Sequence, residues 1–304
     1  MQNAARIKRR RFNPWADRVF SMIGLAVTAL GIVILLALLI DVFMDGFSRL
    51  DLDFLTRFPS RHPEKAGIYA AWVGTLWISI LTAALAFPIG VAAATYLEEY
   101  ARKNWLTDLI EINIANLAGV PSIIYGLLGL GIFVRWMDLE RSILAGGMTL
   151  SLLVLPIIIL SSREALRTIP ASIREASYAL GASKWQTIRN QVLPAAMPGI
   201  LTGAILALSR ALGETAPLIT IGALTYVAFL PKNPIGAEFP FFNLDGLMDP
   251  FSVLPIQIFN WVSRPQKGFA LNAAAAIIVL LAITFCLNAI AVYLRHRSQK
   301  KVRW

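Results

Sequence analysis

Six long apolar stretches limit what this chain can fold into more than any other feature of its sequence. They cover residues 19–43, 69–96, 110–134, 142–160, 199–223 and 271–294. Each is close to the roughly 20 residues that a helix needs to cross about 30 Å of hydrocarbon. Because 57% of the residues are hydrophobic and the mean hydropathy is +0.64, a soluble domain is excluded. The sequence predicts an all-α integral membrane protein with six transmembrane helices, forming a single transmembrane domain over residues 1–304.

The distribution of lysine and arginine predicts the orientation of the helices. The two termini, the second connecting segment and segment 161–198 carry 18 of these residues, whereas the connections on the other side carry nine. Because basic segments are retained in the cytoplasm, we expect both termini and segment 161–198 to be cytoplasmic and segment 224–270 to be extracytoplasmic. A basic run also precedes the first apolar stretch, but that stretch is too long for a signal peptide. We predict an uncleaved anchor.

The net charge of +10 is explained by contact of the basic residues with anionic lipid. The basic residues lie at the ends of apolar stretches and form no aromatic-interleaved patch, so anionic lipid is the expected partner and nucleic acid is not. Cys286 is the only cysteine, and the two histidines, His62 and His296, are far apart in sequence. We therefore expect no disulfide within the chain and no Cys/His metal site.

The polar segment between the fourth and fifth apolar stretches has two amphipathic stripes. They are interrupted by Gly181, and each repeats apolar residues at helical spacing. The stripes consist of Ile173, Ala176 and Leu180, followed by Trp185, Ile188 and Val192. The pattern predicts two short helices, around residues 175–180 and 183–190, hinged at the glycine.

The spacing of Glu175-Ala176, Gly181 and Leu193-Pro194 resembles the EAA motif, the cytoplasmic coupling loop of ABC importer permeases. Two positions depart from that motif, since Ser177 replaces an alanine and Gln191 replaces an isoleucine. The resemblance implies a type I importer permease architecture and docking of this loop on a separate ATPase. Glu175 would then anchor the first short helix near its amino end, where the helix dipole favours a carboxylate.

The fifth apolar stretch contains two charged residues, Arg210 and Glu214, four positions apart and so on one face of a helix. Because an arginine at the centre of a span costs roughly 2.5–3.5 kcal/mol on insertion scales, it should face the bundle interior, a wet cavity or a partner subunit. One interpretation is a buried salt bridge that fixes packing. The other is an anion pathway formed by Arg210, Glu214, the adjacent Thr215 and Tyr125, although core packing is the more common role of such a tyrosine.

Three separated motifs sharpen the resemblance. LSRALGETAPL at residues 208–218, GVPSIIYGLLGL at 119–130 and LPIQIFNW at 254–261 are similar to the phosphate-importer branch of ABC permeases, in particular to PstA-type subunits of the bacterial plasma (inner) membrane. That family implies a heterodimer with a PstC-like sister permease, two copies of a PstB-like ATPase and a PstS-like phosphate-binding protein. ATP and Mg would be bound by the ATPase, with no cofactor in this chain.

Other classes of function stay open at this point. The chain has no G-x-x-x-x-G-K-[ST] motif, so we expect a transport subunit without an ATPase site of its own. A sulfate or molybdate permease and, less favoured, a secondary anion transporter are the alternatives. A secondary transporter needs no long amphipathic inner loop, and inverted repeats are not evident in this sequence.

Proline and aromatic residues give two further expectations. Pro121 and Pro217 lie inside apolar stretches and should kink or break their helices. Segment 224–270 is rich in large apolar side chains, which should return to the membrane surface, pack on a partner or fold over the chain's own helices. They include Phe239, Phe241, Phe242, Phe251, Phe259 and Trp261.

Overall fold

The computed structural model describes residues 14–232 and 245–301, and most of these residues are helical. Five helices in the described ranges are long and apolar enough to cross a membrane. They are Asp17–Phe47, Tyr69–Tyr100, Ile143–Arg167, Lys184–Gly213 and Lys267–Gln299. A sixth candidate span is a pair of helices, Trp105–Ala118 and Ser122–Trp136, bent by 104°. The predicted all-α membrane fold is confirmed, with the third predicted span bent between α4 and α5.

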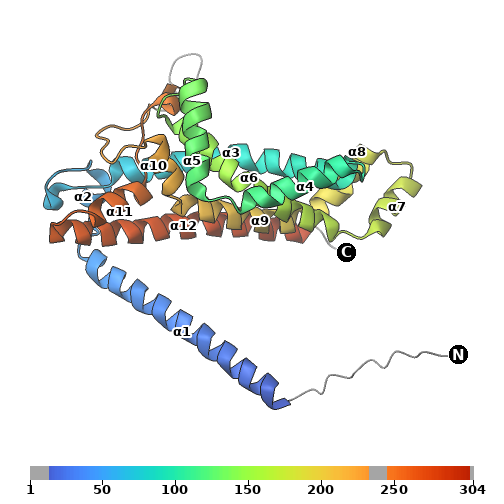
Figure 1. Ribbon diagram of the computed structural model, residues 1–304, viewed down its shortest axis with the longest axis horizontal. Helices are drawn as coiled ribbons and strands as arrows, with labels where there is room; N and C mark the ends of the chain where they lie inside the picture. Colours follow the sequence, from blue (N-terminus) through green and yellow to red (C-terminus); the bar gives the residue numbers. More distant parts are fainter. Residues whose placement is uncertain (1–13, 233–244, 302–304) are drawn as a thin grey trace.

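The helices follow one another as Figure 1 shows. The long ones are α1 (Pro14–Phe47), α3 (Tyr69–Thr95), α6 (Ile143–Arg167), α9 (Leu193–Gly213) and α12 (Lys267–Lys301). The shorter ones are α2 (Leu52–Thr56), α4 (Trp105–Ala118), α5 (Ser122–Gly129), α7 (Ala171–Ala179), α8 (Lys184–Thr187), α10 (Ala216–Ile221) and α11 (Leu254–Val262). Wider π-helical turns extend α3 (η2, Tyr96–Tyr100) and α5 (η3, Leu130–Trp136) and join α8 to α9 (η4, Ile188–Val192). Single 3₁₀ turns lie at Pro63–Lys65 (η1) and Asp245–Met248 (η5).

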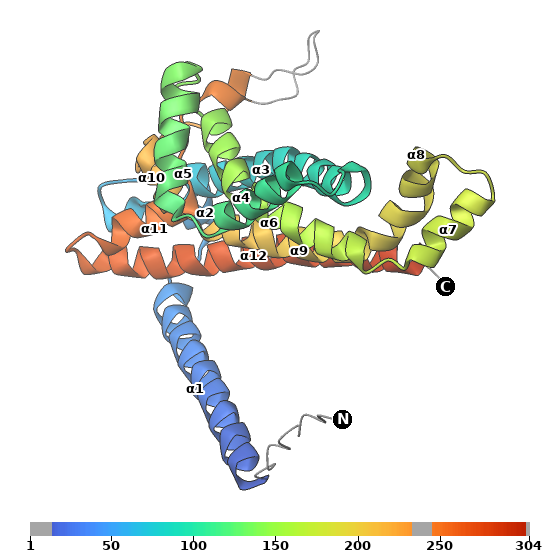
Figure 2. The same ribbon diagram turned by 45° about the vertical axis from the view of Figure 1, so that its right-hand side comes forward.

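Helix α6 lies at the centre of the bundle. Of its most apolar window 67% is buried, compared with 11% for the last span and none for the first. Small residues allow close approach there, as is usual between membrane helices. A Cβ added to Gly147 of α6 would lie 2.5 Å from Leu81 of α3, and one added to Gly90 of α3 would lie 2.6 Å from Ile158 of α6. Helix α1 instead diverges from the bundle in both views (Figures 1 and 2).

The fifth span differs from its prediction. The apolar stretch 199–223 suggested one helix, but the helix runs from Lys184 to Gly213 and then stops. Glu214 has extended backbone angles (φ −77°, ψ 117°), and a separate helix, α10, begins at Ala216. The prediction was wrong because hydropathy continues across the break, whereas helical backbone geometry does not.

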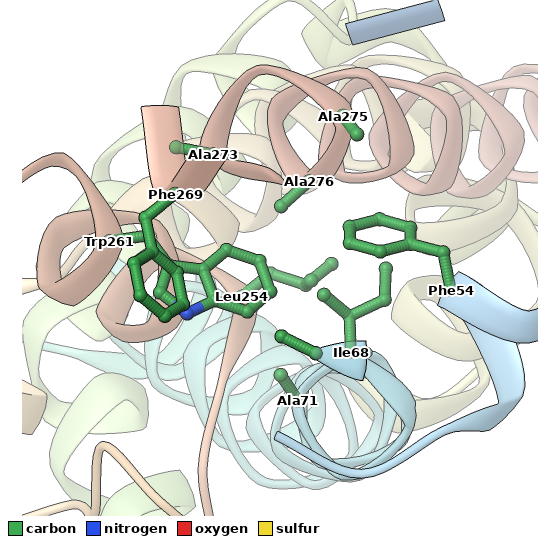
Figure 3. Packing of buried hydrophobic residues seen from close by; sticks show 10 residues of the cluster. Phe54, Ile68, Ala71, Leu254, Trp261, Phe269, Ala273, Ala275 and Ala276 are labelled. Carbon is green, nitrogen blue, oxygen red and sulfur yellow. The ribbon is translucent and has the colours of Figure 1, made fainter. Parts of the chain in front are cut away.

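At the end of the bundle opposite α7, aromatic side chains form a core of their own (Figure 3). Phe54 of α2, Trp261 of α11 and Phe269 of α12 are all buried, with Trp261 between the two phenylalanines at ring-centroid distances of 6.0 and 6.3 Å. Phe251 is buried as well, while Phe259 is 59% exposed. Part of segment 224–270 therefore folds over the chain's own helices. Phe239, Phe241 and Phe242 lie outside the described residues.

Candidate functional site

The coupling segment, residues 171–194, contains the two helices that the sequence predicts, and local signals define their ends. Helix α7 ends in a Schellman motif, in which Ala182 N–H donates to Ser177 O (3.2 Å) and Gly181 N–H donates to Tyr178 O (2.9 Å). Gly181 has φ +83°, a left-handed conformation that favours glycine. Helix α8 begins with a capping box between Ser183 and Gln186. The bend at Gly181 is confirmed.

The boundaries of both helices differ from the prediction. Helix α7 begins at Ala171, so Glu175 lies in its middle and no acidic residue occupies its first turn. The expected stabilisation of Glu175 by the helix dipole is therefore wrong, since that effect is confined to the first turn. The second helix does not end near residue 190 but continues through η4 into α9.

The Leu193-Pro194 pair lies inside this continuous helix. Leu193 N–H donates to Ile188 O, five residues back, so the turn before the proline is wider than an α-helical one. Pro194 has no N–H to donate and would leave a carbonyl unpaired in a regular helix. Leu193 packs against the buried cluster that contains Val192, while Pro194 is exposed. The pair therefore sets the helix geometry where the coupling segment joins the bundle.

One side of the coupling segment stays uncovered. Glu175 and Ala176 are exposed, Leu180 is 90% exposed and Trp185 is 56% exposed. A groove of about 410 Å³ lies between the two helices, lined by Ile173, Ala176, Ser177, Leu180, Ala182 and Gln186, among others. Ile188 and Val192 of the second stripe are instead buried in the bundle. The segment is thus anchored on one side and presents apolar and acidic groups on the other.

Arg210 and Glu214 are close to each other, but not within one regular helix. Arg210 is in the last turn of α9, where a cation interacts favourably with the helix dipole. Its Nε lies 3.4 Å from Glu214 Oε1, across the end of the helix. The side chains are 52% and 19% exposed, respectively. The predicted pair is confirmed, whereas its placement along one helical face is corrected because α9 ends at Gly213.

The two interrupted spans meet beside this pair. Gly119-Val120-Pro121 separates α4 from α5, so the break predicted at Pro121 is found there. Pro217 lies in the first turn of α10, where its missing N–H costs nothing, so the predicted kink at Pro217 is wrong and the break lies at Glu214 and Thr215. Gly126 of α5 packs directly against Pro217, with only 2.6 Å between its ideal Cβ and Pro217 Cα. Only a glycine permits that crossing.

Tyr125 and Thr215 have structural positions near these breaks. The Tyr125 side chain is buried against α6 and α9, with Ala207 among its neighbours. Its hydroxyl donates to Leu117 O at 2.8 Å, which satisfies a carbonyl at the end of α4. Thr215 precedes α10 and accepts from Ile219 N–H through its backbone carbonyl. The Tyr125 hydroxyl is thus committed to the fold, while Arg210 keeps donors available.

Sequence reasoning missed a set of ion pairs near the start of α7, between the end of α6, α7, η2 and α4. Arginines 163, 167 and 174 contact glutamates 98, 99 and 111, which lie 52 to 75 residues earlier in the chain. The signals available in the sequence were two: Glu98 and Glu99 are adjacent, and the three arginines are spaced by four and then by seven residues. Neither indicates which charges meet, since that depends on helix packing.

Comparison with known proteins agrees with this architecture. The family described as "Binding-protein-dependent transport system inner membrane component" matches residues 86–300. The phosphate transport system permease protein PstA of Yersinia pestis is 30% identical over 297 residues, covering 96% of this chain and 95% of that protein. The probable ABC transporter permease YqgI of Bacillus subtilis is 31% identical over 273 residues, covering 88% and 91%, respectively.

Two solved structures share the fold. A bacterial ABC transporter involved in import of the polysaccharide alginate matches with a TM-score of 0.63 and 15% identity, covering 93% of this chain and 96% of that one. An inward-facing MetNI methionine ABC transporter matches with a TM-score of 0.57 and 18% identity, covering 74% and 93%.

The family match over residues 86–300 and relatives at about 30% identity over most of the chain place it in the class of ABC importer permeases. The chain belongs to the inner membrane components of binding-protein-dependent transport systems, within which it is a PstA-like permease. It is accordingly a multi-pass protein of the inner membrane.

Proposed function

We propose that this chain is a permease subunit of an ATP-driven importer for inorganic phosphate and forms half of the translocation pathway. A PstC-like sister permease would form the other half, and a PstS-like protein would deliver phosphate. Relatives named as phosphate transport permeases, which match most of the chain, support this assignment. The exposed apolar side chains of α1 and α12 leave room for a sister subunit.

The observation that carries the proposal is the position of Arg210. Its guanidinium has one ion-pair partner among the described residues, Glu214, and that contact uses Nε only. The remaining N–H groups form a planar set of donors suited to a tetrahedral oxyanion. Interrupted helices are frequent at the binding sites of membrane transporters. Arg210 is therefore well placed to contact the anion beside the break between α9 and α10.

Glu214 supplies a reason for selectivity between anions. An ionised carboxylate only accepts hydrogen bonds. Phosphate keeps at least one proton at neutral pH and can donate it to Glu214, whereas sulfate has none to donate and is repelled. The pairing of Arg210 with Glu214 therefore favours phosphate over sulfate or molybdate.

The energy would come from partner subunits. Two copies of a PstB-like ATPase would bind ATP and Mg, and this chain would contribute no ATPase site. The uncovered side of the coupling segment, with Glu175 and Leu180, would dock in a groove of the ATPase. Closure of the ATPase dimer would then move the coupling segment and switch the access of the pathway.

The proposal is tested by reconstituting the chain with its sister permease, ATPase and binding protein in proteoliposomes and measuring ATP-dependent uptake of radiolabelled phosphate. Glu214→Gln should reduce uptake and weaken the discrimination against sulfate, because the amide can donate to either anion. If Glu214→Gln transported phosphate normally and with unchanged preference over sulfate, the selectivity argument would be wrong.

A matched control is available on α2. Arg57 and Asp53 also form an ion pair four residues apart, at 2.5 Å and with both side chains at least half exposed. Asp53→Asn removes that exposed pair on a different helix, and it should leave uptake and anion preference unchanged. Absence of ATP-dependent phosphate uptake by the wild-type assembly would overturn the proposed substrate.

A further inference from the structure

Three arginines and three glutamates from separate elements meet where the coupling segment joins the bundle, and a fourth glutamate, Glu164, pairs with Arg167 within α6. We call the set without Glu164 the six-residue ion cluster. It consists of Glu98, Glu99, Glu111, Arg163, Arg167 and Arg174. The glutamates come from η2 and α4, and the arginines come from the end of α6 and from α7. The cluster thus joins η2 and α4, which are neighbours along the chain, to α6 and α7 through contacts between residues 52 to 75 positions apart.

The η2 turn is the hub of the cluster. Arg174 of α7 contacts Glu99 at 2.5 Å through one terminal nitrogen and at 3.1 Å through Nε. Its other donors reach Ile169 O at 2.8 Å and Leu166 O at 3.3 Å, at the end of α6. One arginine therefore fixes α7 to both α3 and α6.

The neighbouring glutamate connects the rest of the cluster. Glu98 contacts Arg167 at 2.9 Å and lies 3.6 Å from Arg163 Nε, which is ion-pair distance but longer than a hydrogen bond. Arg163 also contacts Glu111 of α4 at 2.5 Å. The ion pairs thus form two groups, Arg174 with Glu99 and Glu98 with Arg163, Arg167 and Glu111. The backbone of η2, where Glu98 and Glu99 are adjacent, joins the two groups and so connects α7 to α4, the first half of the bent span.

Two further contacts join the coupling helices to each other and to η2. Ser177 of α7 and Thr187 of α8 are joined by a hydrogen bond of 2.8 Å between their hydroxyls. Lys184 of α8 lies over the ring of Tyr100 at 5.0 Å, and Tyr100 is the last residue of η2. Both coupling helices therefore contact the same π-helical turn, a geometry that is frequent at functional sites.

Burial shows why these charges need one another. The side chains of Arg163 and Glu99 are only 5% and 6% exposed. Buried ion pairs seldom add stability over apolar packing, whereas breaking one leaves a charge uncompensated. A cluster of this kind is therefore better explained by the fixed geometry that it imposes than by the stability that it adds.

We propose that Glu98 and Glu99 are positioning residues that connect the coupling segment to the interrupted span, so that α7, η2 and α4 move as one unit. This inference rests on the proposed function, because it assigns the cluster the task of carrying ATPase movement to the pathway. Coupling between distant sites travels through such contiguous contacts when they connect rigid elements.

The test is the amount of phosphate transported per ATP hydrolysed by the assembled transporter. Glu99→Gln keeps the shape of the side chain and removes its charge. It should lower that ratio about tenfold while ATP hydrolysis stays within about twofold, as for the loss of a typical coupling free energy. A residue with a merely structural role would lower both rates together. An unchanged ratio overturns the proposal.

A double-mutant cycle identifies the partner. Glu99→Gln, Arg174→Gln and the double variant should lower the ratio to a similar extent, because each removes the Arg174–Glu99 ion pair, to which the proposal assigns the coupling; the donors of Arg174 to Ile169 O and Leu166 O are lost in both variants that change Arg174. Losses that multiply would overturn the assignment. Arg57→Gln, which removes an exposed pair on α2, is the control and should leave the ratio unchanged. If Glu99→Gln fails to assemble, Arg167→Gln decides the question, since that side chain is 45% exposed and tolerates change more easily.

A distance measurement tests the rigid unit whatever the substrate is. After the single cysteine, Cys286, is replaced, spin labels are placed at the exposed positions Ala179 on α7 and Leu106 on α4. In the wild-type assembly the distance between the labels should stay constant on ATP binding, whereas Glu99→Gln should let it change. A wild-type distance that changes with ATP overturns the proposal. Failure of the wild type to take up phosphate would instead overturn the proposed function alone.

Discussion

The molecule pairs arginine with glutamate in two regions, and the two differ in how fully the charges are satisfied. In the six-residue ion cluster, Arg174 uses three nitrogens on Glu99 and on two backbone carbonyls, and Arg163 is almost fully buried. At the break after α9, Arg210 makes one contact of 3.4 Å and is half exposed. The cluster has little capacity for a ligand, whereas Arg210 has donors to spare.

This difference separates two uses of the same residue types. A set of charges that pair with one another and are largely buried at its centre holds helices in one arrangement, because displacement leaves a charge without a partner. An arginine with unused donors binds a mobile anion, because forming and breaking that contact leaves the fold intact. The cluster therefore suits transmission of movement, and Arg210 suits contact with the transported anion.

The largest expected effect on stability is at the centre of the cluster. Arg163→Met should lower the free energy of unfolding by about 3 kcal/mol, the lower end of the range for a broken buried pair, because Glu111 loses its buried cation while Glu98 keeps Arg167. A fluorescence thermal-shift assay in detergent measures this as a lower unfolding temperature. Arg57→Met, on an exposed pair, is the control and should cost at most about 1 kcal/mol. Equal unfolding temperatures for both variants would break the comparison.

Arg210→Gln should affect transport and leave folding nearly unchanged. Loss of a hydrogen bond to a charged group costs about 1.5–3 kcal/mol, so phosphate uptake should fall about 10- to 100-fold. The unfolding temperature should stay close to that of the wild type, since Arg210 is half exposed. Uptake is measured in proteoliposomes. Normal uptake by this variant would contradict contact with the anion and leave Arg210 with a role in helix packing only.

Gly181 tests the geometry of the coupling segment that the cluster supports. No atom lies within 4 Å of an added Cβ, so a substitution acts through the positive φ alone. Gly181→Val should cost about 1–2 kcal/mol locally and reduce the phosphate transported per ATP. Gly181→Asn is the matched control, because asparagine tolerates this conformation and should retain coupling. Equal coupling in both variants would argue against a role for the bend.

Tyr125→Phe should have the smallest effect. It removes the hydrogen bond to Leu117 O, which contributes about 0.5–1.5 kcal/mol to stability. Because the hydroxyl is committed to the end of α4, uptake should change by less than about twofold. A larger loss of uptake in the proteoliposome assay would return Tyr125 to the pathway and extend the anion site beyond Arg210.

Features encoded by neighbouring residues could be predicted from the sequence. Pro121 interrupts its span because its ring and missing N–H act within one turn. Gly181 ends α7 for a similarly local reason, and the capping box of Ser183 and Gln186 is legible in the sequence as S-x-x-Q.

The boundaries of helices were predicted less accurately, because several local signals compete to set them. Pro217 suggested a kink, but the helix had already ended at Gly213, because Glu214 adopts an extended backbone and Pro217 starts a new helix. Glu175 was expected near the start of α7, yet α7 begins directly after Pro170, four residues earlier than the motif suggests. The hydropathy of the sequence predicts neither the end of α9 nor the start of α7.

The sequence by itself determined the class of this protein: apolar stretches long enough to span a membrane, a helix break at Pro121 and a hinged amphipathic segment. These follow from transfer of side chains into lipid and from backbone geometry, which act over a few residues. Only the tertiary structure decided which charges meet. Arg174 and Glu99 are 75 residues apart, and their contact depends on how α3, α6 and α7 pack, which no short stretch of sequence specifies.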